Sequence, residues 1–148
     1  MKAENQMKLT FESLSTNEGF ARVAVASFIA SLDPTTNEIA DIKTAVSEAV
    51  TNCIVHAYRD SIGVITIHTK IYPERKIVIK ISDKGCGIED VNRAVMPLYT
   101  TLAQEERSGL GFTVMESFMD KMRVRSRVGR GTSVVLEKTL ERKPYDKK

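Results

Sequence analysis

The sequence of 148 residues contains no tryptophan, only two cysteines and no long apolar run. Cys53 and Cys86 are too few for a disulfide framework or a cysteine metal cage. No segment reaches the roughly 18 apolar residues that a membrane span requires, and the opening MKAENQMKLTFE has no apolar core of a signal peptide. A net charge of +3 is too small to indicate nucleic-acid binding by itself. We therefore expect a cytoplasmic protein without membrane contact or direct DNA binding.

The composition is that of an ordinary globular domain. Hydrophobic residues make up 42% of the chain and charged residues 28%, which disfavours disorder and fibrous repeats. The length suits one domain with one core. We predict a single domain over residues 1–148, in which residues 141–148 form an unstructured tail.

Five segments alternate apolar and polar side chains, as half-buried strands do. The pattern predicts a first strand over residues 7–12. It also predicts a hairpin of strands 64–71 and 76–82, and a second hairpin of strands 122–128 and 132–140.

Two long helices are expected between the first strand and the first hairpin, over residues 15–32 and 35–58. Each begins with a capping box, a hydroxyl residue followed three positions later by glutamate. The two boxes are Ser15 with Glu18, and Thr35 with Glu38.

The apolar stripes of these helices predict their buried faces. In the second helix the stripe is Ile39, Ile42, Val46, Ala49, Val50, Cys53 and Ala57. In the first helix the expected core stripe is Phe20, Val23, Ala24, Phe28 and Leu32. Arg22 shares another side with Val25 and Ile29, and an arginine beside apolar residues suits a partner or dimer surface. A solvated arginine beside ordinary core residues is an equally good interpretation.

The remaining segments complete the predicted order of elements. A short helix is expected near residues 91–96, a polar loop over 97–108, and a loop entering a helix at Ser108–Phe112. Paired strands with helices on one face predict an α+β fold. We expect a two-layer α/β sandwich whose mixed, mostly antiparallel sheet is covered on one face by helices.

Glu48 and Asn52 lie one helical turn apart, so they share a face at the edge of the apolar stripe. An asparagine oxygen can bind Mg²⁺, and a glutamate can orient or deprotonate a nucleophile. Taken alone, the pair is better explained as an ordinary polar helix edge, because two-residue motifs recur by chance.

Two glycine-containing loops could contact a ligand. Asp83, Gly85 and Gly87 follow a strand, where glycines allow close backbone approach and the carboxylate can accept from an amine. In Ser108–Phe112, glycines at a helix start could present N–H groups to an anion. A fourth piece, Gly129–Thr132, is by itself a hairpin turn. Taken alone, each piece is more simply explained as a turn or hinge.

Together and in this order, the four pieces resemble the nucleotide site of the gyrase/Hsp90/histidine-kinase/MutL (GHKL) ATPases. Three longer stretches, FARVAVASFIASLDP, IKTAVSEAVTNCIVHAY and ERSGLGFTVMESFMD, resemble the anti-sigma F factors of spore-forming bacteria, a family of serine kinases within that group. This resemblance covers residues 7 to about 140 and implies the GHKL (Bergerat) fold.

The resemblance implies a role for each motif. Glu48 would be the general base, Asn52 the Mg²⁺ ligand, and Asp83 the acceptor for the adenine amino group. Residues 97–108 would form the ATP lid. Relatives often carry a lysine after the Thr-Thr pair, whereas Leu102 stands there, which leaves more to Arg107. The residues implied to bind ATP or ADP are Asn52, Asp83, Gly85, Gly87, Thr100, Thr101, Arg107, Ser108, Gly109, Leu110, Gly111 and Thr132.

The resemblance also implies partners. A homodimer would hold sporulation sigma factor F and phosphorylate a serine of an anti-anti-sigma protein, with Arg22 as a candidate partner contact. Two alternatives stay open: a serine kinase of the general stress pathway, and an ATP-switched anti-sigma module without phosphotransfer. The sequence lacks a phospho-accepting histidine segment, which disfavours a fragment of a two-component sensor.

Overall fold

The computed structural model describes residues 2–95 and 103–143, and within residues 103–110 it describes the backbone alone. Five strands form one sheet in the order β1-β2-β3-β5-β4, and every pairing between them is antiparallel. The strands are β1 (Asn5–Glu12), β2 (Val64–Tyr72), β3 (Lys76–Asp83), β4 (Lys121–Arg127) and β5 (Gly131–Thr139). The sheet is thus antiparallel throughout, so the mixed sheet expected from the sequence is wrong in this respect.

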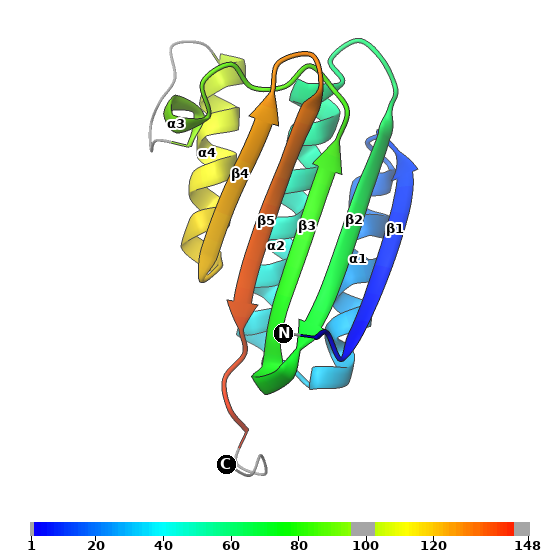
Figure 1. Cartoon of the computed structure of the whole chain (residues 1–148), viewed down its shortest axis with the longest axis vertical. Helices are drawn as coiled ribbons and strands as arrows, with labels where there is room; N and C mark the ends of the chain where they lie inside the picture. The colour runs from blue at the N-terminus through cyan, green and yellow to red at the C-terminus, as the bar shows by residue number, and fades with distance from the viewer. Residues whose placement is uncertain (1, 96–102, 144–148) are drawn as a thin grey trace.

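The described helices lie on one face of the sheet, and among the described elements none covers the other, bare face (Figure 1). The long helices are α1 (Asn17–Ile29), α2 (Thr36–Asn52) and α4 (Ala103–Phe118), and α3 (Val91–Ala94) is a single turn. Short 3-10 turns, η1 (Ala30–Leu32) and η3 (Pro73–Arg75), and a π-helical turn, η2 (Cys53–Ala57), complete the described elements. This arrangement confirms the predicted two-layer α+β sandwich.

The core lies between the helices and the inner face of the sheet. Alternate residues of the central strands point into it, including Ile65 and Ile67 of β2 and Ile79 and Ile81 of β3, all fully or almost fully buried. Burial of such side chains supplies roughly 1.5–3 kcal/mol each. The period-2 pattern of the sequence therefore predicted the buried face of the sheet correctly.

The capping box that begins α2 forms as predicted. The Glu38 amide donates to Thr35 Oγ1 (3.1 Å), and the Thr35 amide donates to Glu38 Oε1 (2.9 Å). Glu38 is also the acceptor for the amide of Glu141 (2.6 Å). Burial opposes ionisation of Glu38, but the hydrogen bonds from the backbone of Glu141 and Thr35 outweigh it and lower its pKa. The Glu38 carboxylate therefore caps the start of α2 and also holds the segment that follows β5.

The capping box expected at Ser15 and Glu18 is wrong. α1 begins at Asn17, and no side chain caps it. The carboxylate of Glu18 accepts instead from Arg22 (3.1 Å) and from the hydroxyl of Ser47 in α2. A tertiary contact to α2 thus replaces the local cap.

The buried face of α1 also differs from the prediction. Ala21, Val25 and Ile29 are fully buried, whereas Phe20 and Val23 are 53% and 57% exposed. Phe28 and Leu32 pack against the core only in part. The helix is apolar on most sides, so its period did not select one face, and docking against α2 and the sheet decided it.

The described helices include none that is both long and apolar enough to cross a membrane. Residues 144–148 of the expected tail lie outside the described residues. Glu141, which belongs to that tail, is held by Glu38 and by a hydrogen bond from Arg75 Nε to its carbonyl oxygen (2.8 Å).

The corrected face of α1 can be tested by paired truncations. Ile29→Ala should destabilise the protein by about 2–5 kcal/mol, because it leaves a cavity in the core. Ser27→Ala, a control at an exposed position of the same helix, should change stability by less than about 0.5 kcal/mol. Urea unfolding with an unchanged m-value measures both. Equal losses for the two variants would contradict the assigned face.

Candidate functional site

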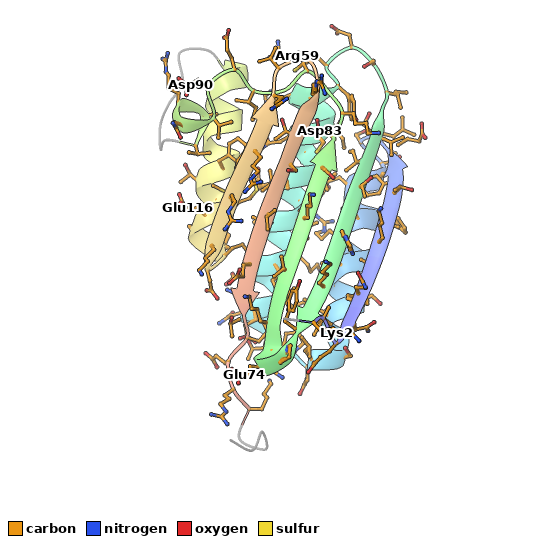
Figure 2. The ribbon with its side chains drawn as sticks, viewed as in Figure 1. Lys2, Arg59, Glu74, Asp83, Asp90 and Glu116 are labelled. Carbon is orange, nitrogen blue, oxygen red and sulfur yellow. The ribbon has the colours of Figure 1, made fainter. Side chains whose placement is uncertain are left out.

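A cavity of about 370 Å³ opens at the end of the sheet where β3 ends and β5 begins. Its walls come from α2 and η2, the loop after β3, α3, α4 and β5. Figure 2 labels three of its lining residues, Arg59, Asp83 and Asp90, towards one end of the molecule. Four of the residues that the resemblance implied for nucleotide binding line it: Asn52, Asp83, Gly87 and Thr132. The fold therefore brings together residues up to 80 positions apart in the chain.

Asp83 is buried, and its orientation is fixed by backbone donors. Its Oδ1 accepts from the amide of Gly85 (2.9 Å) and from the amide of Thr132 at the start of β5 (3.2 Å). Burial and the neighbouring Asp83 carboxylate raise the pKa of the Cys53 thiol well above its usual value, so the thiol stays protonated. A carboxylate held in this way is a preorganised acceptor at the cavity wall.

Two glycines are required here because backbone segments approach closely. A Cβ at Gly85 would lie 2.4 Å from the carbonyl oxygen of Ala57. A Cβ at Gly131, whose φ is +119°, would lie 2.2 Å from the carbonyl oxygen of Asp83. Any larger residue would push η2 or β5 away from the end of β3 and change the shape of the cavity.

The helix that carries Asn52 ends in a π-helical turn. The amide of Tyr58 donates to the carbonyl of Cys53, five residues earlier (3.1 Å). The hydroxyl of Tyr58 then accepts from the amide of Lys84 (2.6 Å) and donates to the carbonyl of Val64 (2.8 Å). Such turns occur often at functional sites, and this one ties the end of α2 to the loop after β3.

Glu48 and Asn52 both face Gly111 of α4. A Cβ at position 111 would lie 3.2 Å from Glu48 Oε1 and 3.3 Å from Asn52 Oδ1. The Asn52 Nδ2 is buried and has no hydrogen-bond partner within the described part of the chain. Because a buried amide without a partner costs free energy, its position is suited to a ligand with polar atoms. Glu48 itself is half-buried and does not line the cavity.

α4 begins earlier than predicted. The helix starts at Ala103, so residues 103–108 are not a loop and Ser108–Gly111 lie inside the helix rather than at its start. The segment AQEER consists of strong helix formers, which explains the longer helix. Thr100 and Thr101 lie outside the described residues, as do the side chains of Arg107, Ser108 and Leu110.

Several side chains that shape the site were not predicted as site residues. Phe112 is buried in the cavity wall. Ser126 in β4 accepts from the amide of Ile88 (2.7 Å) and shares a hydrogen bond with Thr132 Oγ1 (2.8 Å). No sequence pattern marks these residues as site residues, because the role of each depends on a neighbour from another part of the chain.

No cluster of three or more His, Cys, Asp or Glu side chains occurs among the described residues. A metal cage built by the protein alone is therefore absent from that part of the chain. Asn52 is the kind of single oxygen ligand that suits Mg²⁺ when phosphates supply the other ligands.

The chain is similar to known proteins along most of its length. The histidine kinase-like ATPase domain family matches residues 11–138. The anti-sigma F factor of Caldanaerobacter subterraneus subsp. tengcongensis is 57% identical over 96% of this chain and 99% of its own length. The anti-sigma F factor of Clostridium novyi is 55% identical over 93% and 96%, respectively.

Solved structures share the fold. The RsbU and RsbW domains of a Mycobacterium tuberculosis protein match 94% of this chain and 33% of theirs, with a TM-score of 0.69 and 19% identity. The histidine kinase domain of a blue-light activated kinase from Erythrobacter litoralis matches with a TM-score of 0.57 and 21% identity. At these identities the likeness concerns the fold alone. From its sequence relatives, the chain belongs to the histidine kinase-like ATPase domain family and, within it, to the anti-sigma F factors.

Proposed function

We propose that the protein is an anti-sigma factor and a Mg-ATP-dependent protein serine kinase. The observation that carries this proposal is the pairing of Glu48 and Asn52, one helical turn apart, against Gly111, with Asn52 and Asp83 lining the same cavity. The names of the relatives, anti-sigma F factors matched over nearly their whole length, support the same function.

The adenine base would lie at the Asp83 end of the cavity. The carboxylate is held by two backbone amides, so it can accept from an exocyclic amine without rearranging. Guanine would place a carbonyl against this acceptor, and a buried unmatched pair of acceptors is costly. Gly85 and Gly87 let the loop after β3 pack against the backbone of Ala57 and Arg127, and Gly87 and Thr132 line the cavity.

The phosphates would lie towards Asn52 and Gly111. Asn52 lines the cavity, and its buried Nδ2 has no hydrogen-bond partner among the described residues, which suits a phosphate oxygen at this place. When bound, Mg-ATP supplies the transferable phosphoryl group and the charge neutralisation that transfer needs. Asn52 would hold the metal, and Arg107 and the amides of Gly109 and Gly111 would contact phosphate.

The proposed amide contacts require a local change in α4. Inside a helix, the amides of Gly109 and Gly111 face the carbonyls four residues earlier. Each glycine weakens the helix by about 1 kcal/mol relative to alanine. We therefore propose that phosphate binding moves the start of α4 towards Ser108.

Glu48 would act on the incoming serine. Its carboxylate is half-buried beside Asn52, where it can accept the proton of a serine hydroxyl and orient the oxygen. The hydroxyl would belong to an anti-anti-sigma protein, in which a phosphoserine forms.

Partner contacts would involve α1. Arg22 is partly exposed and bonds to Glu18 and to Ser47 Oγ (3.2 Å), the residue before Glu48. Phe20 and Val23 beside it are exposed apolar side chains. We propose this surface for contact with sigma factor F or with the second subunit of a homodimer in the cytoplasm. Val25 and Ile29, which the sequence had placed on it, belong to the core.

Replacing Glu48 tests the proposed general base. Glu48→Gln should keep ATP binding but lower phosphotransfer to the anti-anti-sigma protein by at least about 10²-fold, because glutamine cannot accept the proton. Transfer of labelled phosphate to serine is the measurement. Glu116→Gln, an exposed control on α4, should transfer at the parent rate. Unchanged transfer in Glu48→Gln would exclude the role, and no phosphoserine in the parent would favour a binding module.

Replacing Asn52 tests the metal ligand. In Asn52→Ala, the affinity for ATP should no longer depend on Mg²⁺, because the protein's contact with the ion is gone. Calorimetry with and without a chelator measures this dependence. Asn5→Ala, at the exposed start of β1, serves as the control and should retain it. A Mg²⁺ effect in Asn52→Ala equal to that of the parent would refute the assignment.

Replacing Asp83 tests the base acceptor. Asp83→Asn keeps Oδ1 for the amides of Gly85 and Thr132 but turns the other oxygen into a donor. ATP affinity should fall by about ten- to a hundredfold, the scale of a hydrogen bond to a charged group. Asp60→Asn, exposed after η2, should bind normally. Titration with a fluorescent nucleotide measures the affinity of each variant. An affinity of Asp83→Asn equal to that of the parent would show that the adenine lies elsewhere.

A further inference from the structure

The bare face of the sheet is strongly basic. Within the five strands, its basic side chains are Lys8, His68, Lys70, Lys76, Lys80, Lys121, Arg123, Arg125 and Arg127. The acidic side chains on this face of the strands are Glu12 and Glu137. Glu137 is paired with Lys76 (3.6 Å) and Lys121 (3.9 Å), and Glu12 lies on β1, at the edge opposite to β4. An uncompensated positive area therefore remains over β3, β5 and β4.

That area is also hollowed and carries hydroxyl groups. A shallow depression is lined by Lys80, Arg125, Arg127 and Arg130 together with Ser82 and Ser133. The register places Ser82 opposite Ser133, and Ser133 opposite Arg125. Asp83 borders the depression as well, but its carboxylate is buried and accepts two backbone amides. The hollow thus offers cations and hydroxyl donors to an acidic ligand.

The electrostatics of His68 report the same positive field further across the sheet. Burial and the nearby Lys70, Lys8 and Lys80 lower the pKa of His68. Its Nε2 is 2.8 Å from Gln6 Oε1. The lysines come from β2, β1 and β3, so the field extends across these strands and is not confined to β4.

Protection of an exposed strand edge does not explain this distribution. Charged side chains on an edge strand discourage pairing with other chains, which accounts for arginines on β4. Lys80 lies on β3, the central strand, and His68 and Lys70 lie on β2. These positions have no free edge to protect, so their charges need another explanation.

We propose that the bare face of the sheet is a docking surface for an acidic, extended segment of a partner protein. Arg123, Arg125 and Arg127 alternate along β4, so successive guanidinium groups repeat every ~6.8 Å. Alternate carboxylates of an extended segment have the same repeat. A second copy of this chain would bring two basic faces together and is disfavoured by charge.

Nucleic acid fits this surface less well. Sheets that bind single strands stack bases on aromatic side chains. Among the described strands, the aromatic residue on this face is Tyr72, which is half-buried with the Lys76 ammonium 5.8 Å from its ring centre. The surface lies on the side of the sheet away from the helices (Figure 1), and the proposal does not depend on nucleotide binding.

Binding of a short fluorescein-labelled peptide of alternating Glu and Thr tests the proposal. Fluorescence anisotropy should show saturable binding to the full chain that weakens with added salt. Arg125→Gln/Arg127→Gln should weaken it by at least about fivefold, as expected for two lost charge pairs. Lys2→Gln/Arg142→Gln, which removes the same charge from exposed positions outside the sheet, should bind like the parent.

Two further measurements test whether the bound segment must be acidic. The peptide should raise the pKa of His68 in an NMR titration, because its carboxylates offset the field of the lysines. A matching peptide of Gln and Thr should leave that pKa unchanged. Equal binding by both double variants, an unmoved His68 pKa, or tighter binding of a labelled single-stranded oligonucleotide than of the acidic peptide would each overturn the proposal.

Discussion

The close approach of three backbone segments at the end of β3 is the constraint on which the site depends. Gly85 fits beneath the carbonyl of Ala57, and Gly131 fits against the carbonyl of Asp83, where any Cβ would clash. The same approach brings the amides of Gly85 and Thr132 to one carboxylate oxygen. Because Gly85 and Gly131 have no side chains, the backbone segments pack closely enough to fix the orientation of the buried Asp83 carboxylate. This carboxylate in turn joins β3 to β5.

A second requirement is the position of α2 relative to α4. Gly111 lets α4 approach the turn of α2 that carries Glu48 and Asn52. The π-helical turn that follows, with the Tyr58 hydroxyl bonded to the Lys84 amide, ties this helix end to the loop that follows Asp83. One short segment therefore connects the proposed phosphate end of the site to the proposed base end.

The two faces of the sheet have different chemistry. The inner face is mostly aliphatic, with polar side chains such as Asp83 and Thr132 at the cavity, and it supports the helices that form the cavity. The outer face has an excess of lysine and arginine that pairing with Glu137 neutralises only in part. Because alternate residues of each strand face opposite sides, both chemistries come from the same five segments.

The sequence by itself determined the features that depend on neighbours in the chain. These are the alternation of the strands, the capping box of Thr35 and Glu38, and the shared helix face of Glu48 and Asn52. The order of motifs also indicated the family.

Tertiary structure decided what depends on distant groups. It chose Val25 and Ile29 over Phe20 and Val23 as the buried side of α1, because an almost wholly apolar helix has no preferred face until it packs. It also brought the Thr132 amide to the Asp83 carboxylate and the Ser47 hydroxyl to the Glu18 carboxylate. A hydrogen bond across the fold forms only after the chain has brought both partners together.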